Sequence, residues 1–269
     1  MTSYVTALIT GLFTIIILGL ISFRLKLVDL SGLISGLIIS FLLLFFGGWR
    51  WLLILLFFHF LSSGFTKYGY EYKNNVSGAQ VKGGARSWKN VIANSLIAVL
   101  MSLFEWSSTA DIFIAGFIGT ISTSTADTLA TEIGLLSSKK PRLITNLNEE
   151  VDAGTSGGVT ILGVIASITG SISIAIVSYI LGLGTLSLLK TLLISLLSGT
   201  MGSFADSLLG ARLQRIFKCE KCGKTTEFLN HCGSKTTHLR GYQWIDNNIV
   251  NILATLVGAI IGVLTYKLT

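Results

Sequence analysis

Long apolar runs separated by short polar segments extend through the whole chain. Each run is continuous and close to the roughly 20 residues of a membrane-spanning helix, unlike the alternating segments of about ten residues that form β-barrels. Eight runs fit this description: 4–23, 30–46, 49–62, 91–106, 112–134, 157–181, 186–209 and 249–266. The pattern predicts an all-α, polytopic helical membrane protein with about eight transmembrane helices, forming a single integral-membrane domain over residues 1–269.

Composition and charge support this prediction and add an orientation. Only 12% of the 269 residues are charged, against about 25% in an average soluble domain. The net charge of +7 does not by itself imply a nucleic-acid partner, because 17 of the 20 Lys and Arg residues fall on one side when the spans alternate. By the positive-inside rule, loops 63–90, 135–156 and 210–248 face the cytoplasm, and we expect a multi-pass protein of the cell membrane.

Two similar acidic motifs interrupt the apolar spans. Asp127 lies in Ala-Asp-Thr-Leu and Asp206 in Ala-Asp-Ser-Leu, each a few residues after a Gly-Thr pair. An ionisable group at membrane depth costs several kcal/mol unless it faces a cavity, a metal or a partner, so the repeated motif predicts a shared site. Glu132 lies nearer the interface and is either a further acid of that site or a snorkelling surface residue.

Basic and glycine-rich segments flank these spans on the same side. Residues 82–87 read Lys-Gly-Gly-Ala-Arg-Ser, with Asn94 one turn into the next helix. Glycines beside cations let backbone N–H groups approach an anion, although an ordinary basic loop is the alternative. Residues 152–158 read Asp-Ala-Gly-Thr-Ser-Gly-Gly, and we expect Asp or Thr there to cap a helix whose first N–H groups bind phosphate or are merely capped.

The loop before the last span carries a cysteine cluster, which we treat as an insertion over residues 211–245. Cys219, Cys222 and Cys232 are all of the cysteines, and a Cys-x2-Cys knuckle with a second Cys-Gly pair indicates a structural zinc site. The fourth ligand is His231 or, alternatively, His238. The competing interpretation is three reduced cysteines without a metal.

Polar residues also open the last span. Asp246 is the natural N-cap. Asn247 and Asn251 are four residues apart and share one helical face, which indicates a polar stripe directed at the site.

Together these motifs resemble one integral-membrane family. The segments are residues 82–87 with Asn94, 125–134, 154–158, 205–211 and 246–251, and the resemblance covers the chain from about residue 30 onward. This is the transmembrane protein 19 family, which includes plant phytyl-phosphate kinases, and the cysteine knuckle is similar to that of archaeal-type members. The resemblance implies phosphoryl transfer from a nucleoside triphosphate to a prenyl monophosphate lipid. Similarity of residues 206–211 to dolichol kinases and CDP-diacylglycerol synthases makes CTP the first choice of donor and ATP the second.

The sequence assigns roles on this basis. Asp127 and Asp206 hold Mg²⁺, with Glu132 as a third acid. The residues expected to contact phosphate, nucleotide or metal-bound water are Lys82, Gly83, Gly84, Arg86, Asn94, Thr155, Ser156, Arg212, Asn247 and Asn251. A CTP-dependent cytidylyltransferase acting on a lipid phosphate and a transporter of an anionic solute remain alternatives. The oligomeric state, monomer or homodimer, stays open.

Overall fold

The computed structural model describes residues 2–77, 81–223 and 225–269, and within them eight helices are long and apolar enough to cross a membrane. They are α1 (Thr2–Arg24), α2 (Leu30–Gly47), α3 (Trp49–Lys67), α5 (Trp88–Ser108), α6 (Asp111–Gly134), α7 (Ile161–Ile180), α8 (Leu188–Arg212) and α9 (Asn247–Leu268). The predicted polytopic helical architecture is confirmed. Most boundaries lie within a few residues of those expected from hydropathy, and α3 continues five residues beyond its predicted end at residue 62.

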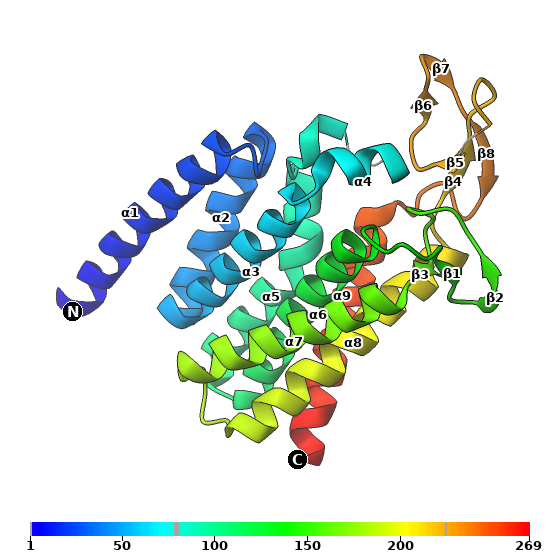
Figure 1. Cartoon of the computed structure of the whole chain (residues 1–269). Helices are drawn as coiled ribbons and strands as arrows, with labels where there is room; N and C mark the ends of the chain where they lie inside the picture. The colour runs from blue at the N-terminus through cyan, green and yellow to red at the C-terminus, as the bar shows by residue number, and fades with distance from the viewer. Residues whose placement is uncertain (1, 78–80, 224) are drawn as a thin grey trace.

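Helix α6 is the centre of the bundle and contacts α3, α5, α7, α8 and α9. Every residue from Ile114 to Ala126 is buried. Large apolar side chains fill the half of the bundle nearer the start of α6, where the rings of Trp51 and Phe117 lie 4.2 Å apart. In contrast, α1 lies at the edge of the bundle beside α2 and exposes most of its apolar surface (Figure 1).

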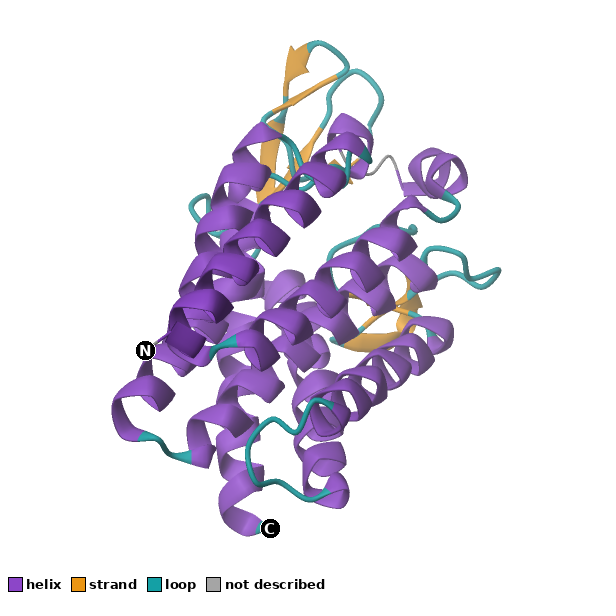
Figure 2. Ribbon diagram, turned by 90° about the vertical axis from the view of Figure 1, so that its left-hand side faces the viewer, coloured by secondary structure: helices purple, strands orange, loops and turns teal. Residues whose placement is uncertain are grey.

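The polar connections gather at one end of the bundle, which we call the loop end, and both termini lie at the opposite end (Figure 1). Short helix α4 (Tyr70–Ser77) and 3₁₀ helix η1 (Val81–Gly84) precede α5. The strands are β1 (Arg142–Leu143), β2 (Asn146–Glu150), β3 (Gly158–Val159), β4 (Ile216–Lys218), β5 (Thr225–Thr226), β6 (Asn230–His231), β7 (Ser234–Lys235) and β8 (Thr237–Arg240). They form antiparallel sheets ordered β2-β1-β3, β5-β4-β8 and β6-β7 (Figure 2).

One predicted helix start is wrong. Helix α7 begins at Ile161, and its cap is Thr160, whose hydroxyl accepts from Gly163 N at 3.0 Å. Residues 152–157 instead form turns, with Gly154 and Gly157 at φ angles of +85° and +86°. Those angles exclude a helix, and the following residues pair with β1.

Candidate functional site

Helices α6, α8 and α9 meet closely at Thr123. Its Oγ1 donates to the carbonyl oxygens of Gly119 and Ser198, each at 2.9 Å. A side chain at Gly202 of α8 or Gly258 of α9 would occupy the space that Thr123 fills. Small residues therefore let three helices approach at this level, as in other membrane bundles.

This junction sets the register of the two acidic motifs. Asp127 follows Thr123 by one turn on α6, and Asp206 follows Gly202 by one turn on α8, so both carboxylates lie just beyond the junction towards the loop end. They line one cavity, which we call the acid cavity. The packing of small residues thus brings together two carboxylates that are far apart in sequence.

The hydrogen-bond partners of the two aspartates are neutral groups. Ser203 Oγ donates to Asp127 Oδ1 at 3.5 Å. The amide nitrogen of Asn251, in the orientation that satisfies its hydrogen bonds, lies 3.0 Å from Asp206 Oδ2 and 2.9 Å from Asn247 O. Among the described residues, no Lys or Arg forms an ion pair with either aspartate. Two adjacent carboxylates without a cation form a donor set suited to a divalent metal ion.

The glycine-rich turn forms another wall of the acid cavity, which Thr155, Ser156 and Asn247 also line. Gly157 lies directly against Ala211, where a side chain would not fit. Ser156 Oγ donates to Gln214 Oε1 at 3.0 Å, and Arg240 of β8 donates to carbonyl oxygens on both the turn and α8. The turn is thereby held rigidly against the end of α8.

A third acid, Glu227, also lines the acid cavity, and the sequence interpretation missed it. Its charge interacts with that of Asp206, and burial, followed by the nearby Asp246, raises the pKa of Glu227. Its position between Cys222 and His231 is the one signal that could have identified it, because a metal-bound loop holds its residues in place.

The predicted cysteine cluster does form in the structure. The ligand atoms of Cys219, Cys222, His231 and Cys232 all lie within 4.8 Å of one another, within reach of one ion bound at about 2.0–2.3 Å. Gly223 N donates to Cys219 O at 2.8 Å and closes the knuckle. Donation from the Cys222 backbone, followed by contact with His231, lowers the pKa of the Cys219 thiol to about 6, which favours the ligating thiolate. His238 lies outside this group and packs edge-on against Phe217.

Glu132 lies elsewhere. Its Oε2 is 2.5 Å from Lys73 Nζ, and both side chains are buried. Lys73 also donates to the carbonyl oxygens of Phe65 and Thr66. This buried ion pair joins α4 to α6 and gives Glu132 a cationic partner that Asp127 and Asp206 lack.

The residues predicted to bind phosphate lie in different parts of the structure. Arg86 and Asn94 line a second cavity, between α1, α2, α3 and α5. Gly83 O accepts from Lys67 Nζ at 2.8 Å, and Gly84 packs against Thr66. Two further residues were predicted to contact phosphate. Arg212 is exposed at the end of α8, and the side chain of Lys82 lies outside the described part of the structure.

Several known proteins are similar to this chain. The family model described as integral membrane protein DUF92 matches residues 13–259. An uncharacterized membrane protein of Methanocaldococcus jannaschii is 33% identical, over 96% of this chain and 94% of its own. Protein PGR of Arabidopsis thaliana is 34% identical, over 91% and 92%. The chloroplastic Protein VTE6 of the same plant is 24% identical, over 74% of this chain and 53% of its own. No solved structure matches.

Proposed function

This chain belongs to the DUF92 family of integral membrane proteins, and we propose that it transfers a phosphoryl group from a nucleoside triphosphate, CTP first and ATP second, to a prenyl monophosphate. The observation that carries this proposal is the acid cavity, where Asp127, Asp206 and Glu227 line a common wall with the glycine-rich turn. The sequence resemblance to phytyl-phosphate kinases supports the choice of acceptor.

The acid cavity fits Mg²⁺ by the chemistry of its donors. Mg²⁺ is usually bound by one or two protein carboxylates together with substrate phosphates and water. Asp127 and Asp206 supply such carboxylates, Glu227 a further one, and Asn247 and Asn251 neutral groups beside them. When bound, the ion would neutralise charge on the phosphates during transfer. We propose Glu227 as the third acid in place of Glu132, because Glu132 is already paired with Lys73.

The reaction requires little further help from the protein. An oxygen of the prenyl phosphate forms a bond to the γ-phosphorus, and the bond from that phosphorus to the β–γ bridging oxygen breaks. The nucleoside diphosphate leaves with the electron pair. Because a phosphate monoester loses its second proton near pH 6, the attacking oxygen is already ionised and no proton transfer is needed. The proposed reaction therefore needs carboxylates that hold the metal ion beside the phosphates, and it needs no general base.

We assign the Cys219–Cys222–His231–Cys232 group to a structural Zn²⁺, because four protein ligands leave no position for substrate. In this scheme the ion fixes the loop that carries Glu227. The excess of basic residues at the loop end supports a cytoplasmic location for that end, where nucleotides are available.

Purified protein in lipid nanodiscs, supplied with γ-labelled and, separately, α-labelled CTP, Mg²⁺ and geranylgeranyl or phytyl phosphate, tests this proposal. We expect γ-label in a prenyl diphosphate and release of CDP. Pyrophosphate with α-label in a CDP-lipid would assign the cytidylyltransferase reaction instead. Absence of both products across CTP, ATP and both acceptors would refute phosphoryl transfer.

A further inference from the structure

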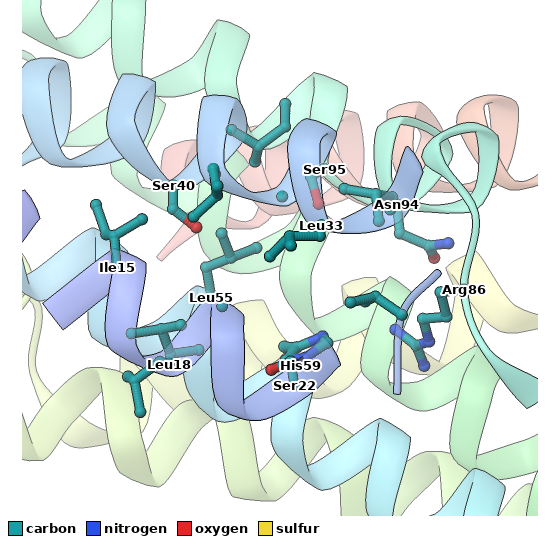
Figure 3. A pocket seen from close by; sticks show the side chains of 18 of the residues that line it. Ile15, Leu18, Ser22, Leu33, Ser40, Leu55, His59, Arg86, Asn94 and Ser95 are labelled. Atoms are coloured by element: carbon teal, nitrogen blue, oxygen red, sulfur yellow. Dashed lines mark hydrogen bonds between the residues drawn. The ribbon is translucent and has the colours of Figure 1, made fainter. Parts of the chain in front are cut away.

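The second cavity is amphipathic, and we call it the Arg86 cavity. It lies between α1, α2, α3 and α5. Side chains such as Ile15, Leu18 and Leu55 line its apolar part, whereas Arg86 and Asn94 lie at the end nearer the loop end (Figure 3). Ser22, Ser40 and His59 also line it, so the cavity is mainly apolar with some neutral polar groups, and Arg86 brings a charge to one end.

Arg86 brings a positive charge to the polar end, where it interacts with the charge of Glu132 but forms no ion pair with that acid, which is paired with Lys73. The guanidinium lies over the Phe58 ring, with Cζ 5.4 Å from the centroid. Among the described residues, none of the side-chain hydrogen bonds or ion pairs uses this guanidinium. Burial lowers the pKa of Arg86 to about 10, so the group remains a cation at neutral pH. A half-buried guanidinium with free donors recognises phosphate or carboxylate.

The backbone around Arg86 is fixed, which keeps its side chain in position. Arg86 N donates to Leu27 O at 3.0 Å, and its carbonyl accepts from Asp29 N at 3.1 Å. These bonds join the start of α5 to the linker between α1 and α2. Asn90 lines the same cavity and adds a side-chain amide, whose N–H groups are donors suited to a phosphate oxygen.

The apolar part lies at the edge of the bundle, beside α1. Helix α1 forms the outer wall and is held near its two ends: Trp49 Nε1 donates to Ala7 O at 3.2 Å, and Ser22 Oγ lies 3.0 Å from His59 Nε2. Gly36 of α2 lines the cavity, and a side chain there would meet no atom within 4 Å. The space between these points is therefore available to a hydrocarbon chain.

We infer that the Arg86 cavity binds a single-chain lipid, with the hydrocarbon chain along Ile15, Leu18 and Leu55 and the phosphate head at Arg86 and Asn90. Identifying this lipid as the phosphoryl acceptor rests on the proposed function, whereas the binding site itself does not. Asn94 connects the Arg86 cavity to α6, because it lines that cavity while its carbonyl accepts from Ser124 Oγ at 3.0 Å. Ser124 lies on α6 about one turn before Asp127, so the two cavities are one helix apart.

Binding of tritiated geranylgeranyl phosphate to the full chain in nanodiscs, with EDTA and without nucleotide, tests the inference. We expect saturable binding that unlabelled geranylgeranyl phosphate displaces. Inorganic phosphate and a two-chain phosphatidic acid should displace it at least 10-fold less well. Equal displacement by phosphatidic acid would show a general phospholipid surface, and equal displacement by inorganic phosphate would show an anion site without a chain site. Either result would overturn the inference.

Two variants divide the site into its parts. Gly36→Leu should fill the apolar part and weaken binding at least 10-fold, whereas Gly64→Leu, at an exposed position of α3 that is equally open, should bind as the wild type does. Arg86→Gln should weaken binding of the phosphate about 10- to 100-fold, as expected for loss of a charge-assisted bond. It should leave binding of geranylgeraniol unchanged, and Arg86→Lys should restore part of the loss.

A photoreactive diazirine analogue of the prenyl phosphate provides a second measurement on the unaltered protein. Label should appear in peptides from α1, α2, α3 or α5. Label confined to α7, α8 and α9, or wild-type binding by both Gly36→Leu and Arg86→Gln, would overturn the assignment. These binding measurements contain no nucleotide and do not depend on turnover. If the lipid binds here but the kinase assay gives no product, only the proposed reaction is refuted.

Discussion

Thr123 of α6 occupies the space that Gly202 of α8 leaves by lacking a side chain. This contact lies one turn before Asp127 on one helix and one turn before Asp206 on the other. The distance between the two acids is therefore controlled by a packing contact that itself carries no charge. Any change that separates α6 from α8 at Thr123 should also separate the carboxylates.

Gly202→Ala tests this coupling. The added methyl group should push α8 away from Thr123, lower stability by about 1–3 kcal/mol as overpacking does, and reduce turnover. Gly64→Ala, on an exposed part of α3, is the control and should keep full turnover. Thermal unfolding in nanodiscs and the prenyl-phosphate kinase assay measure the two effects. Normal turnover by Gly202→Ala would show that this contact does not set the spacing of the acids.

Glu227→Gln should reduce turnover and raise the Mg²⁺ concentration needed for half-maximal rate, because it removes a carboxylate from the acid cavity. We expect turnover to fall at least about 10-fold. This is a small effect for the loss of a group that stabilises charge at a reaction centre. Glu150→Gln removes an exposed carboxylate from β2 and should change neither quantity. A Glu227→Gln protein with an unaltered Mg²⁺ dependence would remove Glu227 from the metal site.

Cys219→Ser should release the bound metal ion, as measured by elemental analysis, and should lower the unfolding temperature. Because Glu227 lies in the same loop, we also expect turnover to fall, so the knuckle affects both stability and activity. His231→Gln should act in the same way. His238→Gln should retain the metal, since His238 lies outside the ligand group. Full activity in metal-free Cys219→Ser protein would separate the knuckle from the reaction.

Glu132→Gln should destabilise the fold by about 3–5 kcal/mol, because it removes the negative charge that balances the buried Lys73 ammonium group. The double variant Lys73→Met/Glu132→Leu should recover part of that loss. The Mg²⁺ concentration for half-maximal rate should stay at its wild-type value in folded Glu132→Gln protein. A large increase in that concentration would return Glu132 to the metal site.

The membrane architecture could be predicted because the length of each apolar run is a local property. The Ala-Asp repeats also indicated Asp127 and Asp206 correctly as residues to examine together, and the structure places both on one cavity. The N-cap of α9 is confirmed at Asp246, whose carboxylate accepts from Asn248 N and Ile249 N. Such signals lie within a few residues of one another.

Other features depend on contacts between distant segments. Lys73 reads as an exposed loop cation, yet α4 folds back and buries it against Glu132. Glu227 reads as an ordinary loop acid until the knuckle places it beside Asp206. Arg86 belongs to a basic loop in sequence, but its hydrogen bonds to the α1–α2 linker place it in a cavity separate from the aspartates. Local pattern carries no signal for these arrangements.

The most direct test of the proposed function is the turnover of Asp206→Asn protein with CTP, Mg²⁺ and geranylgeranyl phosphate. We predict a rate at least about 100-fold below wild type, typical of losing a principal electrostatic group. We also predict an unfolding temperature no lower than that of the wild type, because the substitution removes a buried negative charge that forms no ion pair among the described residues. Asp152→Asn, at an exposed position before the glycine-rich turn, should remain fully active. Near-normal turnover by folded Asp206→Asn protein would contradict the assignment of the acid cavity as the site of phosphoryl transfer.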